Sequence, residues 1–572
     1  MDSSFGKKLL KLTLPYFKYS EERWRARLLL AAIIIIDIAM VVVSIQFTYW
    51  FNNFYDALQA LDKKAFTHQL WIFTLLAFTN IMLGIYNYYL TQKLQINWRR
   101  WLTERYVTQW LAKHAYYRMQ ILNPQSTDNP DQRISEDINL FTSLTLSLSM
   151  GLLSAICTLI AFCTLLWNLS GMLDIPLGHF GILHVPGYML FAALLYAIIG
   201  TWLTYLVGKP LVQLNYNQQR YEADFRFSMV RLRENSESVA LYHGEPQEHV
   251  YFSDCIRAVV ANYKRIIKKQ KQFISLNLTY NQLAIIFPVL VAAPRYFSKA
   301  IKLGGLMQIM KAFDYVHSSL SYIANSFTSI ADWKAVVNRI LRFNDAMENA
   351  NTLQKTENIQ YIAANDADLQ VNGLSLQTPD GKYLVNSLNF NLKPGTRLLI
   401  SGPSGSGKST LIRALAGIWP FGSGHVYIPS HMKKNFIPQK VYLPLGSLRQ
   451  VLNYPLASEA NEQSLRDILT LCKLQHLLPQ LENIANWYQT LSLGEQQRIA
   501  FARVLLQKPN YIFLDEATAS LDEENERILY QTMLEYLPQA TVISIGHRAS
   551  LGKFHTQHMN LLGNGKFEML SG

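Results

Sequence analysis

The stretch TRLLISGPSGSGKSTLIRALAGIW, residues 396–419, decides the fold of the C-terminal part of this chain. Its apolar start predicts a buried strand, and the apolar residues that recur after Thr410 predict a helix. Between them stands the pattern GxxxxGK[ST], in which glycines let backbone N–H groups curl around phosphates and the helix N-terminus adds positive potential. The stretch therefore predicts a phosphate-binding loop in an α/β domain.

This loop supplies the first predicted site residues. We expect the Lys408 ammonium to reach the β- and γ-phosphates of ATP and the Ser409 hydroxyl to ligate Mg²⁺. A chance match to the pattern is disfavoured, because a strand and a helix stand on the correct sides of it. The residues expected to bind ATP here are Gly402, Pro403, Ser404, Gly405, Ser406, Gly407, Lys408, Ser409 and Thr410.

Two further apolar runs bring polar side chains to the same edge of a sheet. YIFL is followed by Asp515 and Glu516, and TVISIG is followed by His547. Because α/β sheets bind ligands at the carboxyl ends of their strands, we expect Asp515 to hold the metal and Glu516 to polarise an attacking water. His547 is expected at the γ-phosphate, although a histidine after a strand is more often structural. Gln439, in NFIPQ, is expected to sense Mg²⁺ or the attacking water.

The N-terminal part of the chain has the composition of a membrane domain. Half of the 572 residues are hydrophobic and 12% are aromatic, with the apolar residues concentrated before about residue 329. The run LLLAAIIIIDIAMVVVSIQFTYWF is long enough to cross a bilayer as a helix. We expect six spans, of which the fifth is broken by Pro288 and Pro294 and the sixth is the least hydrophobic. They lie near residues 28–51, 70–90, 144–167, 188–207, 278–296 and 305–330.

Lysine and arginine are distributed unevenly around these spans. They are frequent before the first span and in the long connections after the second and fourth spans, whereas the loop between the third and fourth spans has none. The positive-inside rule therefore places both termini and both long connections in the cytoplasm. Contact with anionic lipid explains much of the net charge of +13, so we expect no nucleic-acid partner. The start, FGKKLLKLTLP, is expected to lie on the inner surface as an amphipathic helix.

Two motifs in the C-terminal part identify the kind of ATP-binding domain. LSLGEQQR and SLD, together with the phosphate-binding loop, resemble the nucleotide-binding domain of ATP-binding-cassette (ABC) proteins. The resemblance implies that two cassettes pack head to tail, so that each signature motif binds the γ-phosphate of the ATP held by the other chain. With one cassette and one set of spans, the chain would form a homodimer with two equivalent composite sites. The resemblance adds these ATP-binding residues: Ser492, Gly494, Glu495 and Asp522.

Longer stretches narrow the resemblance. NFIPQKVYLPLGSLRQVLNYP, ANWYQTLSLGEQQR and GHRASLGKFHTQH in the cassette, and STDNPDQRISEDI and NSESVALYHGEPQE in the cytoplasmic connections, are similar to subfamily D transporters and to bacterial SbmA/BacA-type transporters. This implies a multi-pass protein of the bacterial inner membrane, with an α-helical, exporter-like type IV transmembrane domain and an α/β P-loop cassette. The expected parts are an amphipathic segment at 1–27, a transmembrane domain with long coupling helices at 28–330, a linker at 331–365 and a nucleotide-binding domain at 366–572.

The cargo follows from the resemblance more than from composition. The bacterial relatives are associated with uptake of bulky hydrophilic molecules, including peptides, bleomycin-like compounds and cobalamin. Polar residues in the spans, such as Asn281, Asp314 and His317, favour a wet cavity, although hydrogen bonds between helices would give the same composition. We expect uptake of hydrophilic solutes, with export or flipping of lipids, acyl-CoA or drugs as the alternative. A membrane ATPase that transports nothing is disfavoured, because an anchor needs only one helix.

One family feature has no clear counterpart in this sequence. ABC cassettes often carry an aromatic residue before the phosphate-binding loop that stacks on adenine. Loop spacing places Leu376 at this position, and a leucine cannot stack. Tyr383 and Tyr442 are substitutes, although most such tyrosines merely pack. The adenine-stacking residue therefore stays open.

Overall fold

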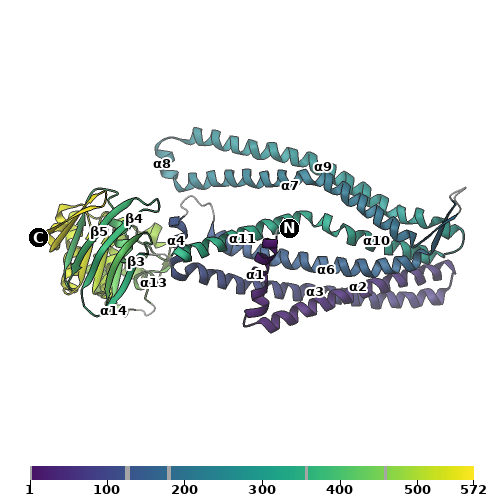
Figure 1. Ribbon diagram of the computed structural model, residues 1–572, viewed down its shortest axis with the longest axis horizontal. Helices are drawn as coiled ribbons and strands as arrows, with labels where there is room; N and C mark the ends of the chain where they lie inside the picture. Colours follow the sequence, from purple (N-terminus) through teal and green to yellow (C-terminus); the bar gives the residue numbers. More distant parts are fainter. Residues whose placement is uncertain (1–2, 123–128, 177–181, 354–357, 457–459, 572) are drawn as a thin grey trace. The chain divides into compact units, whose positions relative to one another are not determined.

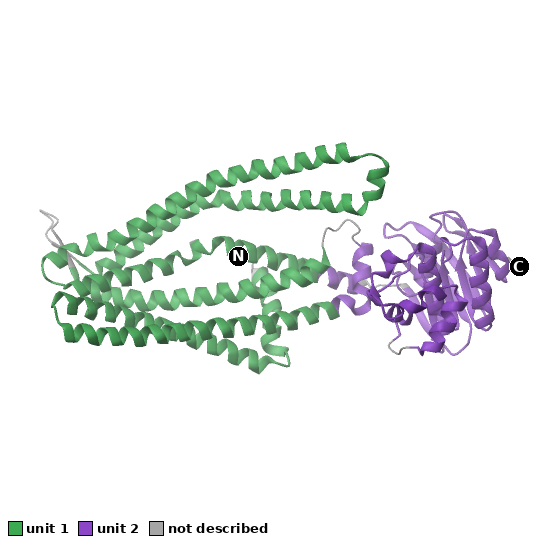
Figure 2. Ribbon diagram, turned by 180° about the vertical axis from the view of Figure 1, so that it is seen from behind, with its two compact units in different colours: residues 1–108, 128–344 green, residues 109–127, 345–572 purple. Residues whose placement is uncertain are grey.

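The chain folds into two compact units (Figure 2). The computed structural model describes residues 3–122, 129–176, 182–353, 358–456 and 460–571. Unit 1 comprises residues 1–108 and 128–344, and unit 2 comprises residues 109–127 and 345–572. Unit 2 thus includes a short segment from the N-terminal half of the chain, in which Ile121 packs against the core of the cassette.

Unit 1 consists mainly of long helices (Figure 1). The long helices are α1 Ser3–Tyr19, α2 Arg23–Gln59, α3 Lys63–Leu111, α6 Ile138–Ser170, α7 Tyr188–Glu234, α9 Glu245–Phe297, α10 Leu303–Asn325 and α11 Phe327–Leu353, the last of which leads into unit 2. Shorter elements are α5 Pro130–Gln132, α8 Ser236–Leu241 and the hairpin strands β1 Met172–Pro176 and β2 Ile182–Pro186. Apolar runs of this length become helices because each then satisfies its own backbone hydrogen bonds in hydrocarbon.

Among the residues that the structure describes, five helical segments are long and apolar enough to span a membrane. They are Arg23–Gln59, Lys63–Leu122, Pro130–Ser170, Tyr188–Glu234 and Glu245–Phe297. These segments contain the first five expected spans. The sixth expected span corresponds to α10, which is helical but is not among the five. The start of α10 is held to α2, because Gly304 N donates to Asp56 Oδ1 at 2.9 Å and Asn52 Nδ2 donates to Gln308 Oε1 at 3.1 Å.

The expected break in the fifth span is wrong. Helix α9 stays helical through both Pro288 and Pro294. A proline in a membrane helix is tolerated where neighbouring helices pack around it. Here α7 runs beside α9 (Figure 1), and Tyr188 Oη on α7 donates to Val291 O at 3.3 Å, which joins the two helices between the prolines.

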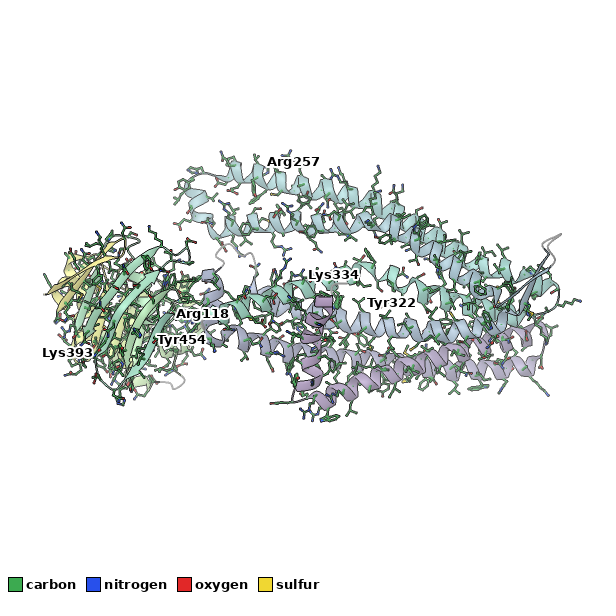
Figure 3. All side chains as sticks on the ribbon, in the orientation of Figure 1. Arg118, Arg257, Tyr322, Lys334, Lys393 and Tyr454 are labelled. Atoms are coloured by element: carbon green, nitrogen blue, oxygen red, sulfur yellow. The ribbon has the colours of Figure 1, made fainter. Side chains whose placement is uncertain are left out.

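Close approach of α6 and α10 depends on one small residue. Tyr322 on α10, labelled in Figure 3, donates its hydroxyl to Leu148 O on α6 at 3.2 Å. A Cβ at Gly151 would clash with the Tyr322 ring and hydroxyl. Small residues of this kind let membrane helices pack closely.

Unit 2 contains two main sheets. The larger has the strand order β14-β13-β6-β12-β11-β8, and the smaller has the order β3-β7-β4-β5. The strands are β3 Asn358–Ala364, β4 Leu369–Gln377, β5 Tyr383–Leu392, β6 Arg397–Ser401, β7 Gly422–Pro429, β8 Lys434–Ile437, β11 Tyr511–Asp515, β12 Thr541–Ile545, β13 Gln557–Gly563 and β14 Lys566–Ser571, with the short pair β9 Gly446–Ser447 and β10 Ile484–Ala485. Strand β3 lies within the residues expected as a linker, yet it pairs with β7.

Unit 2 also contains helices that pack around these sheets. They are α4 Ala115–Leu122, α12 Lys408–Leu415, α13 Leu448–Asn453, α14 Glu462–Leu471, α15 Trp487–Thr490, α16 Leu493–Gln507 and α17 Glu523–Tyr536. Alternate residues of the central strand β11 point to opposite faces, so that Ile512 and Leu514 join one buried cluster and Phe513 joins the other. Strands β6, β12, β11 and β8 are parallel neighbours, so their carboxyl ends meet at one edge of the sheet.

Candidate functional site

The loop after β6 has the backbone needed to enclose an anion. Gly402 has φ +137°, and a Cβ there would clash with Leu561 O. Helix α12 begins at Lys408, directly after the loop, so its free N–H groups lie at the loop. The Ser406 hydroxyl is buried without a hydrogen-bond partner among the described residues. An unpaired buried hydroxyl beside free N–H groups fits a ligand with several acceptor oxygens, such as a phosphate chain.

Lys408 is held over this loop. Its Nζ donates to Gly402 O at 2.7 Å and to Pro403 O at 2.9 Å. Burial lowers the pKa of Lys408, whereas the nearby Glu516 and Asp515 carboxylates raise it. The ammonium therefore sits in a partly desolvated position, where a phosphate would be a stronger partner than backbone carbonyls.

The predicted metal ligands lie next to each other. Asp515 ends β11, and its Oδ1 accepts a hydrogen bond from Ser409 Oγ at 2.9 Å. Burial raises the pKa of Asp515, and the Ser409 hydrogen bond opposes this rise. A hydroxyl and a carboxylate at this separation fit Mg²⁺, which prefers hard oxygen ligands and takes the remaining ones from phosphate and water.

The predicted catalytic residues meet around Glu516, the residue directly after Asp515. Glu516 Oε2 accepts a hydrogen bond from Gln439 Nε2 at 2.8 Å, and Glu516 Oε1 lies 3.4 Å from His547 Nε2. Glu516 has φ +48°, in the left-handed region that a non-glycine residue rarely adopts. Backbone strain of this kind persists where the surroundings fix a functional side chain. Gln439, Glu516 and His547 thus form one group beside Asp515.

The signature motif forms a hydrogen-bonded group that does not include the phosphate-binding loop. Ser492 caps α16 in a capping box with Glu495, whose Oε2 accepts from Ser492 N at 2.9 Å. His476 Nε2 lies 2.8 Å from Glu495 Oε1. Burial would raise the pKa of Glu495, but the hydrogen bonds from Ser492 and His476 lower it overall. Gly494 follows Leu493, whose side chain is strongly exposed.

Asp522 has a similar local role at the next helix. It caps α17, with Asn525 N donating to Asp522 Oδ1 at 2.7 Å. This backbone hydrogen bond lowers the pKa of Asp522. In the described part of the chain, the side chains of Ser492, Glu495 and Asp522 bond to their own segments and, for Glu495, to His476, and none of these bonds reaches the phosphate-binding loop. The structure therefore joins the loop with the catalytic group but leaves the signature group apart.

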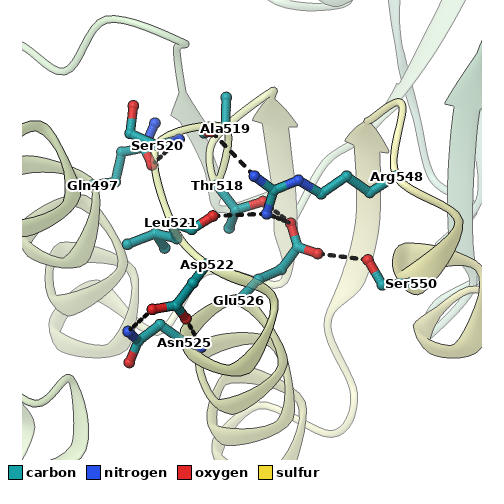
Figure 4. Close-up of polar contacts among 10 residues, drawn as sticks. All are labelled: Gln497, Thr518, Ala519, Ser520, Leu521, Asp522, Asn525, Glu526, Arg548 and Ser550. Carbon is teal, nitrogen blue, oxygen red and sulfur yellow. Dashed lines mark hydrogen bonds and ion pairs between the residues drawn. The ribbon is translucent and has the colours of Figure 1, made fainter.

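A buried ionic network that the sequence analysis missed holds the SLD segment (Figure 4). The Glu526 carboxylate, which is 1% exposed, accepts from Thr518 Oγ1 at 2.6 Å and from Ser550 Oγ at 2.8 Å. Arg548 Nη1 lies 3.5 Å from Glu526 Oε2 and donates to Leu521 O at 2.7 Å. The residue directly after His547 is thus bonded to the segment that carries Asp522. In the sequence, this network is indicated only by the opposite charges of Glu526 in LDEENE and Arg548 in GHR.

The signature helix contacts the same segment. Ser520 N donates to Gln497 Oε1 at 3.1 Å, also visible in Figure 4. Arg548 Nη2 donates to Ala519 O at 3.3 Å. The network therefore fixes SLD relative to both α16 and Arg548, which lies in the loop after β12.

Tyr383, at the start of β5, lies beside the phosphate-binding loop. With Pro403, Ser404 and Asn564 it lines a cavity of about 190 Å³, and half of its side-chain surface is exposed. Leu376, the position reached by loop spacing, is fully buried in the core. Tyr442 does not line this cavity, and its ring packs near Tyr454 with centroids 5.5 Å apart.

Comparison with known proteins matches both units. Residues 12–297 match the family described as ABC transporter transmembrane region 2, and residues 385–519 match the ABC transporter family. An uncharacterized ABC transporter ATP-binding protein of Haemophilus influenzae is 38% identical, over 93% of this chain and 89% of that protein. The inner membrane ABC transporter ATP-binding protein YddA of Escherichia coli K12 is 33% identical, over 91% of each chain.

Two further matches concern subfamily and fold. The human lysosomal cobalamin transporter ABCD4 is 28% identical, over 91% of this chain and 89% of that protein. A bacterial Atm1-family ABC exporter solved with ATP bound has a TM-score of 0.71 at 17% identity, covers 95% of each chain and shows the likeness of fold alone. These matches confirm the exporter-like fold, a helical membrane region joined to an α/β cassette. The chain belongs to the ABC transporter family, as a half-transporter of the subfamily D type that couples ATP hydrolysis to transport.

Proposed function

We propose that this chain forms a homodimer in the bacterial inner membrane, with both termini in the cytoplasm, and takes up bulky hydrophilic solutes. Peptides and cobalamin-like or bleomycin-like compounds are the expected cargo. One observation carries the proposal: Ser409, Asp515 and Glu516 gather at one sheet edge in a chain whose other unit contributes helices of bilayer length. Two relatives, the inner membrane protein YddA and the cobalamin transporter ABCD4, support the location and the cargo class.

Each site residue receives a role in ATP hydrolysis. The loop Gly402–Thr410 binds the phosphates, with Lys408 as its cation. Ser409, Asp515 and Gln439 hold Mg²⁺, which neutralises phosphate charge when bound. Glu516 accepts the proton of the attacking water, because Gln439 and His547 contact its two carboxylate oxygens and so orient them. His547 also contacts the γ-phosphate.

The second copy of the chain completes each site. Ser492, Gly494, Glu495 and Asp522 bind the ATP held by the partner's loop. Two observations support this assignment. The side-chain hydrogen bonds of Ser492, Glu495 and Asp522 do not reach the phosphate-binding loop in the described part of the chain. The neighbouring Leu493 is 63% exposed, as expected for a surface that docks on another chain. The arrangement is symmetric, so one interface contains two equivalent sites.

The membrane unit offers space for a polar solute. Among the cavities of unit 1 is one of about 370 Å³, lined mostly by hydroxyl and amide side chains of α7, α9 and α10. The alternative function, export or flipping of lipids, acyl-CoA or drugs, is favoured by an adjoining cavity of about 820 Å³ that Trp202 and Phe273 line with apolar surface. Because the two functions differ in both the direction of transport and the class of cargo, one experiment should test both.

Proteoliposomes with the cassettes outward separate these functions. An uptake transporter in this orientation should release labelled cobalamin or a labelled peptide from the lumen when ATP is added outside. Glu516→Gln is the control, because it keeps the ATP site but removes the proton acceptor. ATP-dependent movement only from the bath into the lumen would refute uptake and favour export.

A further inference from the structure

The polar cavity of unit 1 has the features of a built binding site. It lies between α7, α9 and α10, and hydroxyl and amide groups such as those of Thr204, Asn281 and Ser321 dominate its lining. Asp314 supplies a carboxylate, and no lysine or arginine lines this cavity in the described part of the chain. A wall of this kind repels an anion such as a phosphate or a thioester of coenzyme A, and it offers hydrogen bonds and one negative charge to a cation.

One wall of the cavity is rigid. The Tyr196 ring on α7 stacks on the Tyr280 ring of α9, with centroids 4.6 Å apart. Tyr280 Oη donates to Tyr196 O at 3.0 Å, and Tyr196 Oη donates to Tyr280 O at 2.5 Å. A Cβ at Gly200 would clash with the Tyr280 ring, so glycine is required for this stack. The reciprocal bonds leave the cavity shape fixed rather than dependent on a mobile side chain.

A second observation indicates a ligand. His317, which also lines the cavity, is only 8% exposed, and its Nε2 has no hydrogen-bond partner among the described residues. Its ring lies 5.1 Å from Tyr280 and 5.7 Å from Tyr196, measured between centroids. Buried polar atoms are almost always paired, so an unpaired imidazole nitrogen in a polar cavity implies a bound molecule or water.

The larger cavity extends the same site. It shares Thr201, Thr204, Asn277 and Asn325 with the polar cavity, and Trp202 and Phe273 give it a broad apolar surface. Lys209 also lines this larger cavity, but it does not line the polar cavity that contains Asp314. Asp314 also lines a further cavity, together with Lys311 and Phe51. There the Lys311 Nζ lies 5.4 Å from the centroid of the Phe51 ring. No ion pair joins Lys311 to Asp314 in the described residues, and Asp314 stays exposed to the cavity.

We propose that the joined cavities form a cargo site for an organic amine with neighbouring hydrogen-bonding groups and an apolar body, as in a short peptide with a free amino terminus. The ammonium binds Asp314, the adjacent amides bind Asn277, Asn281 and His317, and the apolar side chain packs on Trp202. This site rests on the proposed transport function and specifies the chemistry of its cargo.

Binding measured without ATP tests the site separately from transport. The probes are the tripeptide Phe-Ala-Ala and its N-acetylated form, titrated calorimetrically into the full-length protein in lipid nanodiscs. Acetylation removes the positive charge and leaves the rest of the peptide unchanged, so we expect it to weaken binding about tenfold. Asp314→Asn should weaken binding of the free peptide by the same factor and abolish the difference between the two peptides.

Matched variants separate recognition from folding. Asp332→Asn changes an exposed carboxylate on α11 that lines neither cavity, and it should leave the tenfold difference intact. Trp202→Ala should weaken both peptides equally. Equal binding of the two peptides to the unmodified protein, or a difference that persists in Asp314→Asn, would overturn the site. If the protein transports solute but binds the free and acetylated peptides equally, the binding site is refuted and the proposed function stands. If it distinguishes the two peptides but transports nothing in proteoliposomes, the binding site stands and the proposed function is refuted.

Discussion

Replacing Tyr383 by alanine should weaken nucleotide binding while leaving the cassette folded. The ring lines a cavity of about 190 Å³ with residues of the phosphate-binding loop, including Pro403 and Ser404, so we expect it to contact the base of a bound nucleotide. Stacking of a base on an aromatic side chain contributes about 1–3 kcal/mol. Because half of the Tyr383 side chain is exposed, we expect the lower part of that range, about 1–2 kcal/mol, which corresponds to a rise in Kd of about 5- to 30-fold.

Affinity for ADP is the appropriate measurement. ADP carries the same base and lacks the γ-phosphate that is hydrolysed. Isothermal titration of the full-length protein in nanodiscs should show the rise in Kd for Tyr383→Ala, whereas Tyr383→Phe should bind like the unmodified protein. Tyr442→Ala is the matched control, because this tyrosine lies away from the cavity.

Two results would refute this reasoning. One is an unchanged ADP affinity in Tyr383→Ala. The other is an equal loss in Tyr442→Ala, which would indicate a general effect of removing a tyrosine from the cassette. Thermal unfolding of each variant shows whether the fold is retained, since an exposed ring contributes little to the core.

Three further predictions concern the cassette. Glu516→Gln should retain ATP binding and trap a closed dimer, seen as cross-linking between copies; rapid multiple turnover in this variant would contradict its role as proton acceptor. Glu526→Gln weakens the hydrogen bonds from Thr518 and Ser550 in the network around SLD, and it should lower kcat more than it changes KM for ATP. Glu524→Gln, on the exposed face of α17, should leave both constants unchanged. Equal effects of the two substitutions would refute a role for the network. Burial lowers the pKa of His555 to about 4 from 6.5, so between these values the unfolded chain binds a proton that the folded chain does not. Stability is therefore full above pH 6.5 and declines by up to about 3 kcal/mol as the pH falls towards 4, a loss that melting temperatures should show and that His555→Gln should reduce.

Motif spacing predicted that Gln439, Glu516 and His547 lie near one another, because strand order brings them to one edge of the sheet. Asp515 and His547 each follow a short apolar run, and parallel neighbouring strands necessarily end at the same edge of a sheet. Gln439 and Glu516 came within hydrogen-bonding distance for the same reason. These positions depend on local sequence and on one topological rule, so the sequence was sufficient.

Features that depend on tertiary contacts were not accessible in this way. Leu376 was reached by counting residues, but irregular register between β4 and β5 leaves its side chain in the core and brings Tyr383 to the loop. Helix α9 continues through Pro288 beside α7, and the local pattern around the proline indicated a break instead. The Glu526 network joins two segments far apart in sequence, and charge alone did not distinguish this residue from the exposed glutamates beside it.

The composition of unit 2 has a consequence for protein engineering. Residues 109–127 belong to the cassette unit although they precede most of the membrane helices, and Ile121 packs against its core. A recombinant fragment that starts at Asp345 would lack this piece and leave an apolar depression open to water, which promotes aggregation. Swapping ATPase modules between relatives should therefore succeed better when both segments are exchanged together, as a matched set, than when the C-terminal portion alone is grafted.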